Sequence, residues 1–80
     1  FIKAIKELGA NITSVQIRED EADLYTAAGT RITYVLGAEE AALTLATTAF
    51  PSLDVSGNSL LYVDLRFSSK VYFKKRSAPE

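Results

Sequence analysis

The side chains of this 80-residue chain that could take part in chemistry are carboxylates, hydroxyls and cations, because cysteine and histidine are absent. Thiol nucleophiles, imidazole general bases, disulfides and the usual ligands of zinc are therefore excluded. A carboxylate pair for acid–base catalysis would have to be drawn from Asp23, Asp54 and Asp64. These residues fall near a predicted turn, in a predicted loop and on a predicted strand, so nothing in their spacing brings them together.

Other polar stretches are equally poor candidates for catalysis or metal binding. Ser56-Gly57-Asn58 and Ser68-Ser69 carry hydroxyls but have no neighbouring base, and the isolated Gly57 does not make a phosphate-binding loop. The acid-rich segment 19–23 lacks the alternating Asp/Asn spacing and the glycine of an EF-hand loop, so we interpret it as a solvated turn. The sequence predicts a protein that is not an enzyme and needs neither a cofactor nor a metal.

Composition and charge narrow the class of protein further. Hydrophobic residues make up 48% of the chain and charged residues 24%, which is typical of a globular domain and not of a disordered chain. Nine basic and ten acidic residues leave a net charge of −1, which gives no overall attraction for nucleic acid. No apolar run approaches the roughly 20 residues of a membrane span. We expect residues 1–80 to form a single domain cut from a longer protein, because the first residues already have the pattern of a helix interior.

Local patterns predict three elements in the first half of the chain. Apolar residues recur at helical spacing over residues 1–8, and Gly9 stands where a left-handed helix cap belongs. β-Branched residues dominate Ile12–Arg18, which we interpret as a strand. Residues 22–27 and 31–36 then have the pattern of a hairpin. Its predicted loop is Ala28–Thr30, with Gly29 at a positive φ, and this arrangement would place four residues on one face: Leu24, Thr26, Ile32 and Tyr34.

A second helix and a second hairpin are predicted after Gly37. Residues 38–50 carry glutamates in the first turn and an apolar stripe, and Pro51 ends the helix. In "LLYVDLRFSSKVYFKKR", residues 60–76, apolar and polar side chains alternate with period two, which indicates two half-buried strands. A three-residue loop, 68–70, would pair Phe67 with Val71, Leu65 with Phe73 and Asp64 with Lys74, with Lys70 in a left-handed conformation.

These elements together predict an α+β fold. We expect a mostly antiparallel sheet with two helices, in the order α-β-β-β-α-β-β, and with the C-terminal hairpin at the edge of the sheet. Asp64 and Arg66 lie two residues apart on one strand face, so their side chains can meet and Lys74 can join them. We interpret this pair as structural, because it would orient the hairpin.

The same residues carry a resemblance to a known family. "YVLG" before a helix, followed by "YVDLRF", a reversal and a short alternating strand, resembles the C-terminal β-domain of the bacterial cell-division family FtsQ, also called DivIB. The positions that match the family pattern are Gly37, Val63, Asp64, Leu65 and Arg66, and Phe67 fills its aromatic position. Two details depart from the family, which often has Tyr where Phe67 stands, and Gly or Asn-Gly where Lys70 stands.

The resemblance implies a scaffold without catalytic activity. FtsQ-like proteins have a cytoplasmic tail, one membrane span, a POTRA domain and this β-domain outside the membrane, and they bind the coiled-coil proteins FtsB and FtsL at the division septum. The tail, the span and the POTRA domain are not in these 80 residues. In the family the last strands of the β-domain receive an extended segment of FtsB, which implies partner-binding roles for Phe67, Val71, Tyr72, Phe73, Lys74 and Lys75.

The residues themselves leave two interpretations of this C-terminal strand open. An edge strand over residues 71–76 would offer unpaired N–H and C=O groups to an added strand, and its basic side chains would attract an acidic partner. The same lysines can instead prevent two copies from pairing edge to edge. In a second alternative, the chain is a structural extracytoplasmic module without a partner, and a missing part of its own chain covers the edge.

Overall fold

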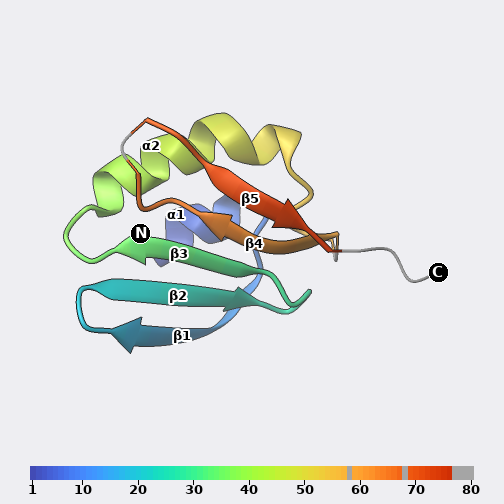
Figure 1. Cartoon of the computed structure of the whole chain (residues 1–80). Coiled ribbons are helices and arrows are strands. Elements are labelled where there is room, and N and C mark those ends of the chain that lie inside the picture. Colours follow the sequence, from blue (N-terminus) through green and yellow to red (C-terminus); the bar gives the residue numbers. More distant parts are fainter. Residues whose placement is uncertain (58, 68, 77–80) are drawn as a thin grey trace.

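A single five-stranded sheet forms the centre of the computed structural model, which describes residues 1–57, 59–67 and 69–76 (Figure 1). The strands follow one another across the sheet in chain order, from β1 at one edge to β5 at the other. The elements are α1 (Ile2–Glu7), β1 (Ile12–Arg18), β2 (Glu21–Thr26), β3 (Arg31–Val35), α2 (Glu39–Ala49), the 3-10 helix η1 (Phe50–Ser52), β4 (Leu60–Asp64) and β5 (Tyr72–Lys75).

Both α-helices lie on the same side of the sheet, as Figure 1 shows, and we call the opposite side the outer face. The core fills the space between sheet and helices. It includes Ile5 of α1, Ala42 and Ala46 of α2, and Ile32 and Val63 of the central strands, none of which is more than 1% exposed. Burial of these apolar side chains is the main force that holds the two layers together. Within the described residues, no helix is long and apolar enough to cross a membrane.

The α+β class and the order of elements predicted from the sequence are confirmed, but the prediction of a mostly antiparallel sheet is wrong. The sheet is mixed, because β3 and β4 pair in parallel, with Ile32 opposite Val63. The chain leaves β3, passes through α2 and η1, and returns to run beside β3 in the same direction. A helical crossover of this kind is the usual connection between parallel neighbours.

The first hairpin has the predicted faces but a different register. The N–H of Thr26 donates to the carbonyl of Thr30 at 2.9 Å, so Ala27–Gly29 form the reversal instead of Ala28–Thr30. Leu24 therefore lies opposite Ile32. Gly29 has the expected positive φ, at 91°. The N–H of Thr30 donates to the hydroxyl of Thr26 at 3.0 Å, which fixes the closing position of the loop.

The C-terminal hairpin shows the same kind of difference. Asp64 lies opposite Tyr72 and Val63 opposite Phe73, so the pairing is shifted by two residues from the predicted one and the faces are preserved. The three-residue turn is replaced by a longer connection between Asp64 and Tyr72. Lys70 is not left-handed, because Glu19 is the only non-glycine residue with a positive φ in the described part of the chain. Ser68, part of the predicted loop, lies outside the described residues.

Candidate functional site

Strand β5 forms an open edge of the sheet. It pairs with β4 on one side, and no other strand of the described chain pairs with it on the other. All four of its residues are exposed. An edge of this kind presents main-chain donors and acceptors to solvent and can accept a further strand.

One hydrogen bond at the end of β5 shows which of its main-chain N–H and C=O groups point towards β4 and which point away. The N–H of Arg76 donates to the carbonyl of Ser59 at 2.7 Å, so the main chain of Arg76 points towards β4. Because successive residues of a strand point their N–H and C=O groups in opposite directions, those of Phe73 and Lys75 point away from β4. These are the groups that an added strand would meet.

An apolar hollow lies beside this edge on the helix side of the sheet. Phe73 lies opposite Val63, so it is on the helix side, yet it is 45% exposed. Its ring and four other residues line a hollow of about 260 Å³: Ala49, Ser52, Leu53 and Val71. The hollow lies where α2 ends at Ala49 and η1 follows, with Pro51 preventing the helix from continuing.

The outer side of the same edge is aromatic and basic. Tyr72 is 49% exposed, and its ring meets that of Phe67 edge to face, with centroids 5.2 Å apart. Lys74 lies opposite Tyr62 on this side, whereas the exposed Lys75 alternates to the helix side, like Phe73. The six residues to which the sequence assigned partner binding are therefore divided between the two faces of one edge.

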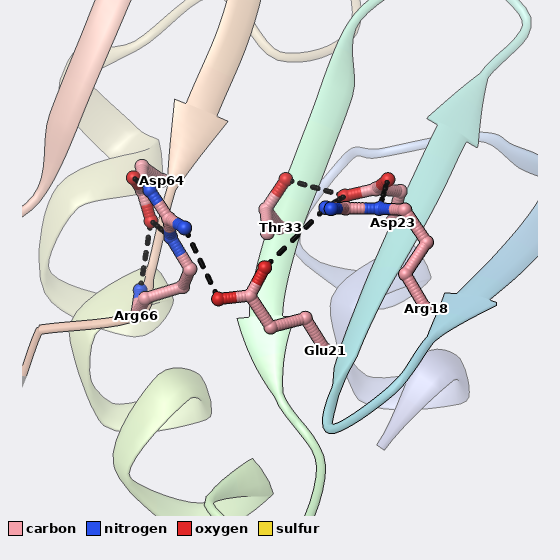
Figure 2. A network of polar contacts seen from close by, with 6 residues as sticks. All are labelled: Arg18, Glu21, Asp23, Thr33, Asp64 and Arg66. Atoms are coloured by element: carbon pink, nitrogen blue, oxygen red, sulfur yellow. Dashed lines mark hydrogen bonds and ion pairs between the residues drawn. The ribbon is translucent and has the colours of Figure 1, made fainter.

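The motif residues Asp64, Leu65 and Arg66 anchor the start of the connection that leads to β5. Asp64 Oδ1 accepts hydrogen bonds from the main-chain N–H of Arg66 at 3.0 Å and from its Nε at 2.9 Å, and Oδ2 accepts one from Nη2 at 2.7 Å (Figure 2). Leu65 is 3% exposed, and its N–H donates to the carbonyl of Thr33 at 2.8 Å. The prediction that Asp64 and Arg66 meet is confirmed. Lys74 is opposite Tyr62, not Asp64.

Gly37, the remaining motif residue, ends the turn after β3. Its φ of 92° is readily available only to glycine, and its N–H donates to Glu39 Oε2 at 3.0 Å. Gly37 therefore belongs to the turn between β3 and α2, and not to the β4–β5 connection that the other three motif residues begin.

The network continues across the outer face to residues that the sequence analysis placed in a solvated turn. Arg66 pairs with Glu21 at 3.1 Å, and Arg18 pairs with Glu21 at 3.4 Å and with Asp23 at 2.8 Å (Figure 2). The Thr33 hydroxyl donates to Asp23 Oδ1 at 2.7 Å. The turn prediction is wrong for Glu21 and Asp23, because both lie within β2, and Asp23 is only 3% exposed. The sequence does contain a signal for this strand, because Glu21, Asp23 and Tyr25 alternate with the apolar Ala22 and Leu24.

The arginines hold both buried carboxylates in their charged form. Hydrogen bonds from Arg18 outweigh burial and lower the pKa of Asp23. For Asp64 burial is the largest single influence and acts to raise the pKa, but the hydrogen bonds from the side chain and main chain of Arg66 together outweigh it, so the pKa is lowered. These ion pairs stabilise the sheet and leave neither carboxyl protonated as an acid catalyst requires.

The candidate carboxylates do not form one acid–base pair, although Asp23 and Asp64 both line a hollow of about 600 Å³ on the outer face. Asp54 accepts a hydrogen bond from the Ser59 hydroxyl at 2.8 Å, away from Asp23 and Asp64, which pair with different arginines. No group of three or more Asp or Glu side chains that could hold a metal ion occurs in residues 1–57, 59–67 and 69–76.

Comparison with known proteins adds no assignment. The chain matches no model of a protein family, and no curated protein matches it.

Proposed function

We propose that this domain is a non-catalytic scaffold that binds an extended segment of a partner protein as an additional strand on β5. The observation that carries the proposal is the open main-chain edge of β5 beside the apolar hollow that Phe73 helps to line. Main-chain hydrogen bonds would supply affinity, and side-chain positions on alternate faces would supply specificity.

The two faces of β5 define the partner segment. Side chains beside Phe73 would enter the apolar hollow, so that position favours an apolar residue. Side chains beside Tyr72 and Lys74 would lie on the outer side, where Lys74 favours a carboxylate. A segment in which apolar and acidic residues alternate therefore fits this edge in one of its two possible parities.

We further propose, on the resemblance to FtsQ/DivIB, that the partners are FtsB-like and FtsL-like division proteins. The function would then be to assemble the division septum on the extracytoplasmic side of the cell membrane. The matching residues Gly37, Asp64, Leu65 and Arg66 support this assignment. Three of them hold the start of the β4–β5 connection, which leads to the edge strand of the proposal. The specific partner rests on the resemblance, and the edge geometry supports the mode of binding.

The test is a titration of the isotope-labelled domain with the C-terminal segment of the cognate FtsB-like protein, followed by amide chemical shifts. The largest shifts are expected at Val71–Lys75. Phe73→Glu should abolish binding, because it places a charge at the apolar hollow. Ile17→Glu on β1 is the matched control, because Ile17 is also exposed at a sheet edge, and it should leave binding unchanged.

Folding of the variants has to be established in the same experiment. Unchanged circular dichroism and thermal unfolding of Phe73→Glu would show that only the interface was lost, and Lys74→Glu provides a second, outer-facing variant with weaker binding. Shifts confined to β1 or to the helices would contradict the proposal. An unchanged spectrum at saturating peptide would support the alternative of a structural module without this partner.

A further inference from the structure

A row of four side chains crosses the outer face of the sheet at one level. Tyr25 of β2 lies opposite Arg31 of β3, Arg31 lies opposite Tyr62 of β4, and Tyr62 lies opposite Lys74 of β5. Aromatic rings and cations therefore alternate across four neighbouring strands. We call these four residues the cation–aromatic row.

The adjacent level of the same face is electrostatically balanced without a ligand. There Asp23 is bound by Arg18, and Asp64 is bound by Arg66, with several hydrogen bonds to each carboxylate. Every buried side-chain nitrogen and oxygen in the described residues has a hydrogen-bond partner. The acid–arginine network is thus complete in itself, and a ligand would find few vacant donors there.

The two cations of the cation–aromatic row differ from the arginines of this network in their pairing. Within the described part of the chain, neither Arg31 nor Lys74 makes a hydrogen bond or an ion pair through its side chain. The Arg31 guanidinium instead lies over the Tyr62 ring, 5.5 Å from its centroid. Arg31 lowers the pKa of Asp23 and Asp64 only through longer-range attraction. Its N–H donors remain available.

Arg31 and Lys74 share one hollow. The four residues of the row line a depression of about 440 Å³ together with Gly29 and Leu61. Arg31 lies over the Tyr62 ring, and Lys74 occupies the strand position opposite Tyr62, so both cations border the depression that this ring lines. A guanidinium can bind a carboxylate with two parallel hydrogen bonds, and an ammonium adds a third donor group.

We infer that the cation–aromatic row, Tyr25, Arg31, Tyr62 and Lys74, is a docking site for a carboxylate side chain of an acidic polypeptide. Charge complementarity supports an anion, and the rings of Tyr25 and Tyr62 offer apolar surface to its methylene groups. A nucleic acid fits less well, because Glu21, Asp23 and Asp64 lie on the same face and the chain has a net charge of −1.

This site does not depend on strand addition at β5. It uses side chains on the outer face, whereas strand addition uses the β5 main chain and the helix-side hollow. Only Lys74 is common to both. The two proposals can therefore fail separately, and a variant at Phe73 distinguishes them.

The test is a titration of the whole 80-residue chain with acetylated and amidated tetraglutamate, with tetraglutamine as the uncharged control. Amide and side-chain shifts are expected at the four row residues with tetraglutamate alone. Arg31→Gln should weaken the affinity by about fivefold or more, since one charge-assisted pair is lost. Lys6→Gln removes an exposed cation from α1 and should change the affinity by less than about twofold.

Three further measurements test which kind of ligand binds and whether it binds at the cation–aromatic row. Phe73→Glu should leave tetraglutamate binding to the row unchanged, and loss of binding in that variant would show that the peptide occupies the β5 edge instead. Inorganic phosphate or glucuronate that binds the row as tightly as tetraglutamate would overturn the assignment to a polypeptide carboxylate. Equal affinity of wild type and Arg31→Gln would overturn the site itself.

Discussion

The two edges of the sheet, β1 and β5, differ in what lies beside their exposed apolar side chains. On β1, Val15 and Ile17 are 43% and 65% exposed, and they lie on the helix side because they pair with Leu24 and Ala22. On β5, Phe73 is 45% exposed on that same side. Val15 and Ile17 line none of the hollows described above, whereas Phe73 borders one that α2 and η1 complete. Exposed apolar area is common to both edges, and the hollow is specific to β5.

Charge separates the edges in the same way. Arg18 at the end of β1 turns onto the outer face and binds Asp23 and Glu21. Lys74 and Lys75 of β5 make no ion pair within the part of the chain that the structure describes. The cation of β1 is therefore paired within the fold, whereas, among the described residues, Lys74 and Lys75 are not. This contrast teaches that an edge suited to docking is recognised by its surroundings, not by the number of its apolar residues.

The largest effect should come from removing the apolar anchor between β4 and β5. Leu65→Ala is expected to lower the free energy of unfolding by about 2–4 kcal/mol, because Leu65 is 3% exposed and its removal leaves a cavity. Chemical denaturation monitored by circular dichroism measures this change. A loss below that of an ordinary surface substitution would mean that the β5 side is not fixed by the core.

The Asp64–Arg66 pair should have the next largest effect. Arg66→Gln is expected to lower the free energy of unfolding by about 1–2 kcal/mol, because Asp64 would be left partly buried without its cation. The Arg66 side chain is 38% exposed, and solvent screening keeps the value below that of a fully buried pair. Arg66→Lys keeps the charge but loses the forked hydrogen bonds. Its free energy of unfolding should therefore lie between those of the wild type and Arg66→Gln in the same denaturation experiment.

Acid should lower the stability of the sheet through Asp23 in β2 and Asp64 in β4. Their pKa values are lowered in the folded state, so their contribution to stability is fully present above the ordinary carboxyl pKa of 3.8 and is lost as the pH falls through the lower folded values. Thermal unfolding between pH 6 and about pH 2 measures this loss. Asp64→Asn and Asp23→Asn should each flatten the acid limb, and an unchanged slope in both variants would contradict the lowered pKa values.

The smallest effect is expected at the β1 edge. Ile17→Thr should change the free energy of unfolding by less than about 0.5 kcal/mol, because the side chain is 65% exposed and threonine retains the β-branch. Binding of the partner segment should also be unchanged. Weaker binding in this variant, measured by the same titration, would mean that the two edges act together and that the contrast between them is wrong.

The faces of the strands could be predicted from the sequence, but their registers could not. Apolar side chains of period two fix which side of a strand is buried, so Leu24 and Ile32, or Val63 and Phe73, share a face in any register of the correct parity. The register depends on loop details. After β4, Asp64 binds the N–H of Arg66 and takes the chain out of the strand before the predicted turn begins.

For the candidate surfaces, too, the sequence predicts which residues are exposed but not which of them come together. The exposed aromatic and basic residues of β5 are evident from their alternation near the end of the chain. The hollow beside Phe73 depends on where η1 follows α2, and the contact of Arg31 with Tyr62 depends on a parallel pairing between strands far apart in sequence. No local pattern encodes such a pairing, because its register is set by the packing of the intervening helix.

The parallel junction between β3 and β4 also determines how the domain would respond to mechanical force. The β1–β2–β3 meander and the β4–β5 hairpin meet in the sheet at three residue pairs, from Arg31–Tyr62 to Thr33–Asp64. The hydrogen bonds from Thr30 to Leu60 and from Leu65 to Thr33 flank these pairs. A pull on a strand added to β5 would reach the meander through β4 and this short seam, and in parallel through the hydrogen bond from Arg76 Nη2 to the Gly29 carbonyl at 3.1 Å, so these few contacts would share the load.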